Sequence, residues 1–347
     1  MNNNRDNYFI VILNWNGWKD TQLCIESILK NTLDNNFNII LVDNGSSIDE
    51  IKEIKEYCNE RFDFVINDSK EVFLDSSFSL PKQYHDYKNN KKIIFIENNE
   101  NLGFAIGNNI ALRMLRTINV KYALLLNNDT EVTPRSLSNM YTNLLNHEKN
   151  KVVAVIPQIR YFSPNNLIWN CGGNINWLGI RKYLYPMKDV NNFQLTGNTY
   201  VDYGTGCAIL FDLEKVGLLS EKYFFGEEDF EMAYRIKRNK GRILCTFDSI
   251  IYHKVGASRV KISDKKISNM VYHYSQRMAN LKDQLPIFTW YLSLIAHMLS
   301  SARLLVNSSL FSLKRFKSMW EDILHNVKSL DKFSKEDFLR ISSKSYR

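Results

Sequence analysis

Acidic side chains in this chain of 347 residues stand directly after short apolar runs. Asp43 follows the run 39–42 and opens the turn Asp-Asn-Gly-Ser, and Asp129 follows the run 123–126 after two asparagines. Each carboxylate either caps the backbone of its turn or binds a ligand. As a ligand group, Asp43 would accept a hydrogen bond from a pyrimidine ring N–H or a ribose hydroxyl. Asp129 would hold a divalent cation together with substrate phosphates.

Two further segments have residue types suited to nucleotide binding. Asn14 and Asn16 follow the first apolar run, with the same choice between a turn and a ligand contact. The segment 101–109 places Gly103 and Gly107 at the start of a predicted helix. Glycine there admits a close ligand, and a helix amino terminus favours phosphate or ribose oxygens, although a simple loop explains the same residues.

A cluster of acids marks the start of another predicted helix. Residues 226–231 read Gly-Glu-Glu-Asp-Phe-Glu, and capping by acids at a helix amino terminus explains part of the cluster. Four acids in five positions exceed what capping needs, so one of them is a candidate general base towards a hydroxyl nucleophile. His253 ends a later apolar run, where a structural role and a metal-ligand role are both open.

The elements that must position these residues alternate between two periodicities. Runs typical of buried strands alternate with helical spacing in the order 8–13, 21–31, 38–42, 48–57, 92–97, 107–117 and 122–126. Further strand-like runs follow at 152–156, 207–211, 242–247 and 250–253. This alternation predicts a mostly parallel sheet with ligands beyond the carboxyl ends of its strands. The polar stretch 61–91 is expected to be a surface insertion.

Composition excludes several classes of protein. With 44% hydrophobic and 24% charged residues, the chain is not disordered as a whole. Its five cysteines are scattered without a C-x-x-C pair, which argues against a disulfide framework or a structural zinc site. The amino terminus has no signal-peptide pattern, and no window reaches about 18 strongly apolar residues. We therefore expect a cytoplasmic protein.

The net charge of +8 lies at the carboxy-terminal end. Residues 259–347 contain 16 Lys and Arg against 7 Asp and Glu, so residues 1–258 are close to neutral. A neutral body argues against nucleic acid as a partner, and a basic tail favours a membrane surface or an acidic partner. Within the tail, residues 285–313 have apolar side chains at helical spacing. This helix is expected either to pack on the rest of the chain or to lie on anionic lipid.

Taken in order, the motifs resemble glycosyltransferase family 2, and most closely its rhamnosyltransferase-like subgroup of bacterial cell-surface polysaccharide synthesis. The resemblance covers about residues 8–258 and rests on NWNG, DNGS, NLGFAIGNN, LLLNNDT, GTGCAILF, GEEDFEMAYR and YHKVGAS. It implies an α/β fold of the GT-A type, Rossmann-like, with a mostly parallel central sheet flanked by helices. This catalytic domain would span 1–258, followed by a basic helical extension over 259–347 that is a candidate for membrane association.

The resemblance also implies roles for single residues. Asp229 matches the catalytic base, beside Glu228 in contact with acceptor or donor sugar, and the run EEDFE leaves open which of the two is the base. Asp129 and His253 match the ligands of Mg²⁺ or Mn²⁺. Gly206 and Cys207 would lie under the donor sugar. The nucleotide-binding residues that we expect are Asn14, Asn16, Asp43, Gly103, Asn109 and Asn128. Two positions depart from the family pattern, namely Asn127 in place of the first acid of D-x-D and Asn108 where many members have Arg.

The implied reaction is inverting transfer of one sugar from a dTDP- or UDP-linked donor to a hydroxyl of a lipid-linked or glycan acceptor. The expected setting is O-antigen or capsule synthesis at the cytoplasmic face of the inner membrane, with rhamnose as the first expected sugar. A processive synthase is disfavoured because Q-x-x-R-W is absent, and a retaining enzyme because of the acidic helix start. The remaining alternative is a non-catalytic nucleotide-sugar-binding subunit of an assembly complex, against which the presence of Asp129, Asp229 and His253 argues.

Overall fold

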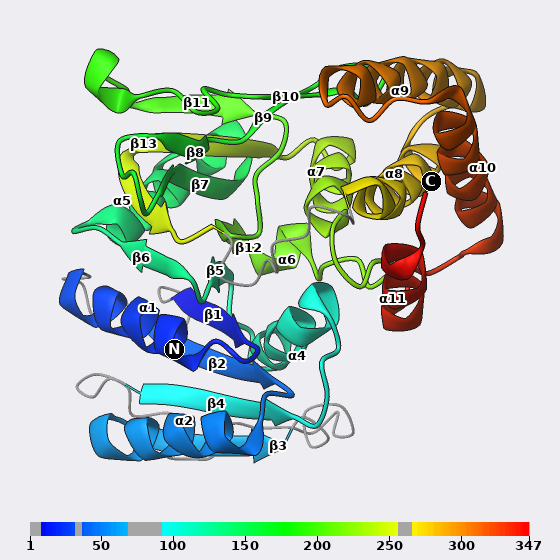
Figure 1. Ribbon diagram of the computed structural model, residues 1–347. Coiled ribbons are helices and arrows are strands. Elements are labelled where there is room, and N and C mark those ends of the chain that lie inside the picture. The colour runs from blue at the N-terminus through cyan, green and yellow to red at the C-terminus, as the bar shows by residue number, and fades with distance from the viewer. Residues whose placement is uncertain (1–7, 32–36, 69–91, 256–265, 347) are drawn as a thin grey trace.

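The computed structural model describes residues 8–31, 37–68, 92–255 and 266–346. Their helices and strands are shown in Figure 1. In chain order they are β1 (Tyr8–Asn14), α1 (Trp18–Asn31), β2 (Phe37–Asn44), α2 (Ile48–Arg61), β3 (Asp63–Asp68), β4 (Lys92–Asn98), α4 (Phe104–Thr117), β5 (Tyr122–Asn127), β6 (Thr130–Val132), α5 (Ser136–Asn146), β7 (Val152–Tyr161), β8 (Ile168–Asn170), β9 (Gly173–Ile175), β10 (Arg181–Tyr183), β11 (Asn198–Val201), β12 (Ala208–Asp212), α6 (Leu213–Val216), α7 (Glu228–Arg238), β13 (Arg242–His253), α8 (Lys266–Gln284), α9 (Ile287–Asn307), α10 (Leu313–Ser329) and α11 (Lys335–Ser343).

One large sheet runs through the molecule in the strand order β11-β13-β7-β12-β5-β1-β2-β4-β3, with β6 paired to β13 and β8 to β7. Strands β5, β1, β2, β4 and β3 are parallel to their neighbours in this row. Strand β12 runs antiparallel between β5 and β7, and β7 is parallel to β13. The expected mostly parallel central sheet flanked by helices is therefore confirmed, and its parallel half brings the ends of β1, β2 and β5 together.

Both faces of the sheet are covered, as the continuous apolar runs of its strands require. Side chains alternate along β1, so that Ile10 and Ile12 pack in one core with α1, α2 and α5, while Val11 packs in the other with α4, α6 and α7. Figure 1 shows α1 and α4 on opposite sides of β1. This arrangement leaves the carboxyl ends of the strands for polar residues.

Two sequence predictions need correction here. The stretch 61–91 does not begin as an insertion, because Arg61 ends α2 and β3 pairs in parallel with β4 at the edge of the sheet. Residues 69–91 lie outside the described part of the chain. The runs 242–247 and 250–253 form one strand, β13, with an irregular register against β7 between Thr246 and Ile250. In both cases the apolar pattern is interrupted by polar residues that backbone pairing tolerates.

The basic carboxy-terminal segment folds onto the sheet domain. Helices α8, α9, α10 and α11 share a core with Tyr223, which precedes α7. Backbone hydrogen bonds join the two parts, because Phe224 donates its N–H to the carbonyl of Phe333 at 2.9 Å and Phe333 donates to that of Lys222 at 2.8 Å. Figure 1 shows these helices gathered on the side of α7. Within the described residues, no helix combines the length and hydropathy that crossing a bilayer requires.

Candidate active site

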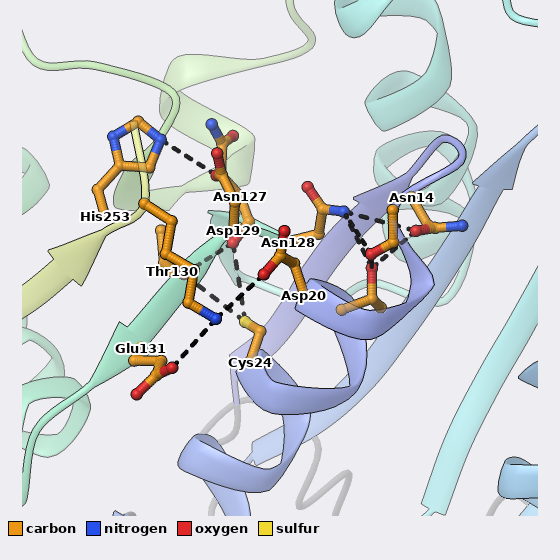
Figure 2. A network of polar contacts seen from close by, with 12 residues as sticks. Asn14, Asp20, Cys24, Asn127, Asn128, Asp129, Thr130, Glu131 and His253 are labelled. Atoms are coloured by element: carbon orange, nitrogen blue, oxygen red, sulfur yellow. Dashed lines mark hydrogen bonds and ion pairs between the residues drawn. The ribbon is translucent and has the colours of Figure 1, made fainter. Parts of the chain in front are cut away.

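A network of amides and hydroxyls occupies the joint end of β1, β2 and β5. The parallel register sets Asn14 opposite Asp43, and the Nδ2 of Asn14 donates to the Oδ1 of Asp43 at 2.9 Å. The Oδ1 of Asn14 accepts from the Thr21 hydroxyl at 2.7 Å, and Asn128 donates to that hydroxyl at 3.0 Å. Figure 2 shows Asn14 and Asn128 pointing toward one another across this edge. Three of the expected nucleotide-binding residues are thus in one network, to which Thr21 is an addition that the sequence patterns did not single out.

Asp43 and Asn16 also build the turn that follows β2. Asp43 is fully buried, and its Oδ2 accepts the N–H of Ser46 at 2.9 Å. Asn16, exposed and with a φ of 48°, accepts the N–H of Ser47 on its side-chain oxygen at 2.9 Å. Asp43 therefore stabilises its turn, which is one of the two roles predicted for it. Contact with a nucleotide base would use the remaining lone pairs of its carboxylate or the side chain of Asn16.

Gly103 and Asn109, which were also expected to bind the nucleotide, are not part of this network. Gly103 has a φ of 84°, and a Cβ there would stand 2.4 Å from the carbonyl oxygen of Phe224, so the chain needs glycine for close packing. Asn109 is fully buried. Its amide exchanges two hydrogen bonds of 2.9 Å with the backbone of Leu219 and donates to Glu221 at 2.7 Å. These contacts use Asn109 to fasten α4 to the loop before α7, away from the network of Asn14.

Asp129 and His253 meet although 124 positions separate them in the chain. The antiparallel register of β6 with β13 sets His253 opposite Thr130, and the Nε2 of His253 lies 3.1 Å from the Oδ1 of Asp129. Figure 2 shows the two side chains directed at one another. Both are nearly buried, with 8% of Asp129 and 7% of His253 exposed. Within the described residues, Asp129 Oδ1 and His253 Nδ1 have no hydrogen-bond partner of good geometry.

The side chains of Asp129 and His253 fit two ligand positions of a divalent cation whose other ligands are water or substrate. Two atoms that bind one small cation at about 2.1 Å each stand about 3 Å apart, which is the separation found here. The described residues offer no cluster of three His, Cys, Asp or Glu side chains. Waters and substrate phosphates would therefore complete the coordination, as is usual for Mg²⁺ and Mn²⁺.

The four acids at the start of α7 have four different partners. Glu227 is buried in ion pairs with Arg181 and Arg277, and Glu231 pairs with Arg235 at 3.1 Å. The Oε2 of Glu228 accepts the N–H of Gly226 at 2.7 Å. The Oδ1 of Asp229 accepts the N–H of Gly206 at 2.8 Å. The N-cap residue, Glu227, makes no side-chain capping bond, so capping does not explain this cluster, and the chain positions Asp229 by a contact from outside the helix.

Burial and neighbouring charges shift the pKa values of these carboxyl groups in different directions. Desolvation, with the negative charge of Asp229 beside it, raises the pKa of Glu228 well above its ordinary value. Desolvation also raises the pKa of Asp229, against the hydrogen bonds from Gly206 and Thr205. Burial opposes ionisation of Glu227 as well, but the Arg181 and Arg277 guanidiniums outweigh it and hold its pKa low. Asp229, with a raised pKa and a place beside a cavity, has the properties of a general base.

The cavity beside Asp229 has a volume of 340 Å³. Five of its eleven lining residues are aromatic, and Thr205 and Asn170 add polar groups. The aromatic residues that line it are Tyr161, Trp169, Tyr183, Tyr203 and Phe230. The ring of Trp169 also packs edge-on against His253, with 4.4 Å between ring centroids. A cavity of this lining suits a ring-shaped molecule with apolar faces and hydroxyl edges.

Gly206 and Cys207 connect the end of β5 to Asp229. The N–H of Asn127, at the end of β5, donates to the carbonyl of Cys207 at 2.8 Å. The N–H of Gly206, the residue before Cys207, donates to the carboxylate of Asp229. Burial, and after it the nearby charges of Asp129 and Asp229, raise the pKa of the Cys207 thiol. The thiol therefore stays protonated and neutral. Gly206 and Cys207, which were expected to lie under the donor sugar, are thus hydrogen-bonded to Asp229 on one side and to the end of β5 on the other.

Comparison with known proteins shows which sequences and folds this chain resembles. Residues 72–217 match the family model described as glycosyl transferase family 2. This match covers less than half of the chain. The matched segment contains Asp129, Gly206 and Cys207, whereas Asp229 and His253 lie beyond it. A curated relative, the low-salt glycan biosynthesis hexosyltransferase Agl10 of Haloferax volcanii, is 26% identical over 217 residues. That match covers 60% of this chain and 64% of the relative, which is less than two thirds of its length.

Solved structures share the fold of most of the chain. TarS 1–349 of S. aureus is 11% identical with a TM-score of 0.54, over 96% of this chain and 83% of that chain. GalNAc-T7, solved with UDP, GalNAc and Mn²⁺, is 17% identical with a TM-score of 0.51, over 86% of this chain and 58% of that chain. At these identities the similarity shows the fold, and the expected GT-A type is confirmed.

Some site residues gave no signal in the sequence. Four of the five aromatic lining residues come from strands and loops between 161 and 203, whose spacing shows no periodicity, and Phe230 comes from α7. Arg181 lies on the β9–β10 hairpin and meets Glu227 only in the folded chain. The excess of acids at 226–231 was the signal that could have predicted a buried cation partner, since a buried carboxylate needs one.

Proposed function

We propose that this protein is an inverting glycosyltransferase that moves one sugar from a nucleoside diphosphate sugar to an acceptor hydroxyl. The observation that carries the proposal is the position of Asp229 beside a cavity whose wall residue Trp169 packs against His253, the partner of Asp129. The family 2 match supports the reaction class. The GalNAc-T7 structure, which holds UDP and Mn²⁺, is consistent with a nucleotide and a divalent cation here.

In the proposed mechanism, Asp229 removes the proton of the acceptor hydroxyl. The acceptor oxygen then forms a bond to the anomeric carbon from the side opposite the diphosphate, and the bond from that carbon to the phosphate oxygen breaks. The nucleoside diphosphate leaves with the electron pair, and Asp229 later returns the proton to water. A Mg²⁺ or Mn²⁺ held by Asp129 and His253 would neutralise charge on the leaving diphosphate.

Each side of the site has a proposed ligand. Asn14, Asn16, Asp43 and Asn128 would bind the nucleoside at the end of β1, β2 and β5. The aromatic cavity beside Asp229 would hold the acceptor sugar, with one ring face against Tyr183 or Trp169. The resemblance of the motifs to the rhamnosyltransferase-like subgroup makes dTDP-rhamnose the first donor to test and UDP-linked hexoses the second. The proposed acceptor is a lipid-linked or glycan saccharide of O-antigen or capsule synthesis.

Calorimetry followed by a turnover assay tests the proposal. UDP, dTDP, GDP and CDP are titrated into the full chain with and without Mn²⁺, and the donor sugars of the nucleotides that bind are then offered with saccharide acceptors. We expect Mn²⁺-dependent binding of dTDP or UDP and a product of inverted anomeric configuration by NMR. Binding without turnover of any donor, including slow hydrolysis, would favour the non-catalytic subunit. Absence of nucleotide binding would contradict both.

A further inference from the structure

Helix α9 exposes its apolar face. Six large apolar side chains on one side of the helix are between 55% and 72% exposed, namely Ile287, Phe288, Tyr291, Ile295, Leu299 and Val306. At 100° per residue they cover an arc of about 120°, the width of the stripe that an amphipathic helix normally buries. Exposed apolar patches of this kind mark sites of interaction with another surface.

The opposite, inward face of α9 combines Ser293, His297 and Ser301 with the apolar Trp290 and Leu305, and hydrogen bonds fix it. Ser293, His297 and Ser301 are buried against the other carboxy-terminal helices. Trp320 of α10 donates its indole N–H to the hydroxyl of Ser301 at 3.0 Å, and Trp290 donates to the carbonyl of Met278 in α8 at 3.0 Å. A rotation of α9 that buried its apolar stripe would break these contacts, so the outward stripe belongs to the fold.

The charges around the stripe identify the surface that it fits. Residues 284–320 contain no Asp or Glu, whereas Arg303, Lys314, Arg315 and Lys317 are basic. Arg303, Lys314 and Lys317 are exposed, and Arg315 is half-buried, with hydrogen bonds to the carbonyls of Leu310 and Tyr346. A second copy of this face would bring like charges together, which disfavours a symmetric dimer. An anionic surface with an apolar interior satisfies both the stripe and the basic groups.

We propose that the α9 stripe lies on an anionic lipid bilayer, parallel to its surface. The six apolar side chains would enter the boundary between headgroups and acyl chains, and the basic residues would meet anionic headgroups. The helix would not cross the bilayer, in agreement with its hydropathy. The exposed residues of this inference take no part in the proposed reaction, so the two can succeed or fail separately.

Vesicle flotation of the full chain tests the inference. Vesicles of phosphatidylcholine are compared with vesicles that also contain about 30% phosphatidylglycerol, and we expect stronger binding to the anionic vesicles, weakened by high salt. The double variant Phe288→Ser/Leu299→Ser should lower the partition coefficient about tenfold or more, because it removes two large side chains from the bilayer. The matched control is Leu23→Ser/Leu339→Ser, which removes exposed leucines from α1 and α11 and should bind as the wild type does.

A charge variant separates the two parts of the attraction. Arg303→Gln/Lys314→Gln/Lys317→Gln should lose most of the preference for anionic vesicles, whereas Lys52→Gln/Lys149→Gln/Lys240→Gln removes as many exposed charges elsewhere and should keep it. Thermal unfolding checks that each variant is folded. The inference is overturned if the wild type does not float, or if the α9 double variant floats as well as its control. Concentration-dependent dimerisation that the α9 variant abolishes, without vesicle binding, would assign the stripe to a second copy.

Discussion

The carboxylate of Glu227 stands 3.7 Å from the Nε of Arg277, a residue of α8 in the carboxy-terminal segment. Glu227 immediately precedes α7, two positions before Asp229. Asn280, one turn further along α8, donates to the same carboxylate at 3.2 Å, and Arg181 contacts it from the β9–β10 hairpin. The helix that holds the proposed base is therefore anchored by residues on both sides of it in the chain.

Arg277→Met should lower the free energy of unfolding by about 2–4 kcal/mol, because it leaves a buried carboxylate with fewer partners. In the double variant Glu227→Gln/Arg277→Met the loss should be smaller than the sum of the single losses, with a coupling of about 1–3 kcal/mol. Urea unfolding of the four proteins measures both quantities. Strict additivity would show that Arg277 acts on stability by packing and not through Glu227.

Asp229→Asn should lower the rate of transfer by about 10²–10⁴-fold, the usual contribution of a general base. Nucleotide affinity should stay unchanged, since Asp229 lines the cavity and is not part of the network of Asn14, Asp43 and Asn128. Steady-state kinetics and calorimetry measure the two effects. Glu231→Gln is the matched control, because that carboxylate pairs with Arg235 on the same helix. Normal turnover in Asp229→Asn would remove it as the base, and a loss confined to Glu228→Gln would assign the role to Glu228.

The pH dependence of kcat/KM should rise through about pH 6, where the raised pKa of Asp229 places the change from acid to base. The ionised carboxylate is the active form, so activity is lost as the pH falls below this value. Asp229→Asn should flatten this limb, whereas Glu231→Gln should leave it in place. A limb that persists in Asp229→Asn would belong to another group.

Glu228→Gln should stabilise the protein at alkaline pH. Burial raises the pKa of Glu228 from 4.5 to about 8, so the folded state holds this proton more tightly than the unfolded state does. Stability is therefore lost as the pH rises from 4.5 towards 8. The variant should melt at a higher temperature than the wild type at pH 8 and at a similar temperature below pH 4.5, as thermal unfolding at the two values would show. An equal difference at both values would mean that ionisation of Glu228 is not the cause.

Asp129→Asn and His253→Ala should each weaken the Mn²⁺-dependent part of nucleotide binding by about tenfold or more. Calorimetric titration of UDP or dTDP at several Mn²⁺ concentrations separates that part from metal-independent binding. Glu131→Gln is the control, because Glu131 is adjacent on β6 but pairs with Lys254 at 3.2 Å. If Glu131→Gln and Asp129→Asn have the same effect, local charge and not coordination explains it.

Local patterns were sufficient for much of this protein. Apolar runs predicted β1, β2, β4 and β5, because a strand buried on both faces needs side chains of one kind. Polar residues after those runs located the ligand edge, because parallel strands end together. The start of α7 was also predicted within a residue. These features depend on a few consecutive residues, and one sequence contains all the information they need.

The contacts between distant residues were decided by the tertiary structure. The antiparallel register of β6 and β13 brings His253 to Asp129, and no local pattern specifies a register between strands so far apart in the chain. The amide of Asn109, which the sequence patterns assigned to nucleotide binding, instead bonds α4 to the loop before α7. The periodicity of α9 showed an apolar stripe, but the buried contact of Ser301 with Trp320 determined that the stripe faces outward. Sequence determines which face of an element is apolar, whereas only the packing of its neighbours decides where that face points.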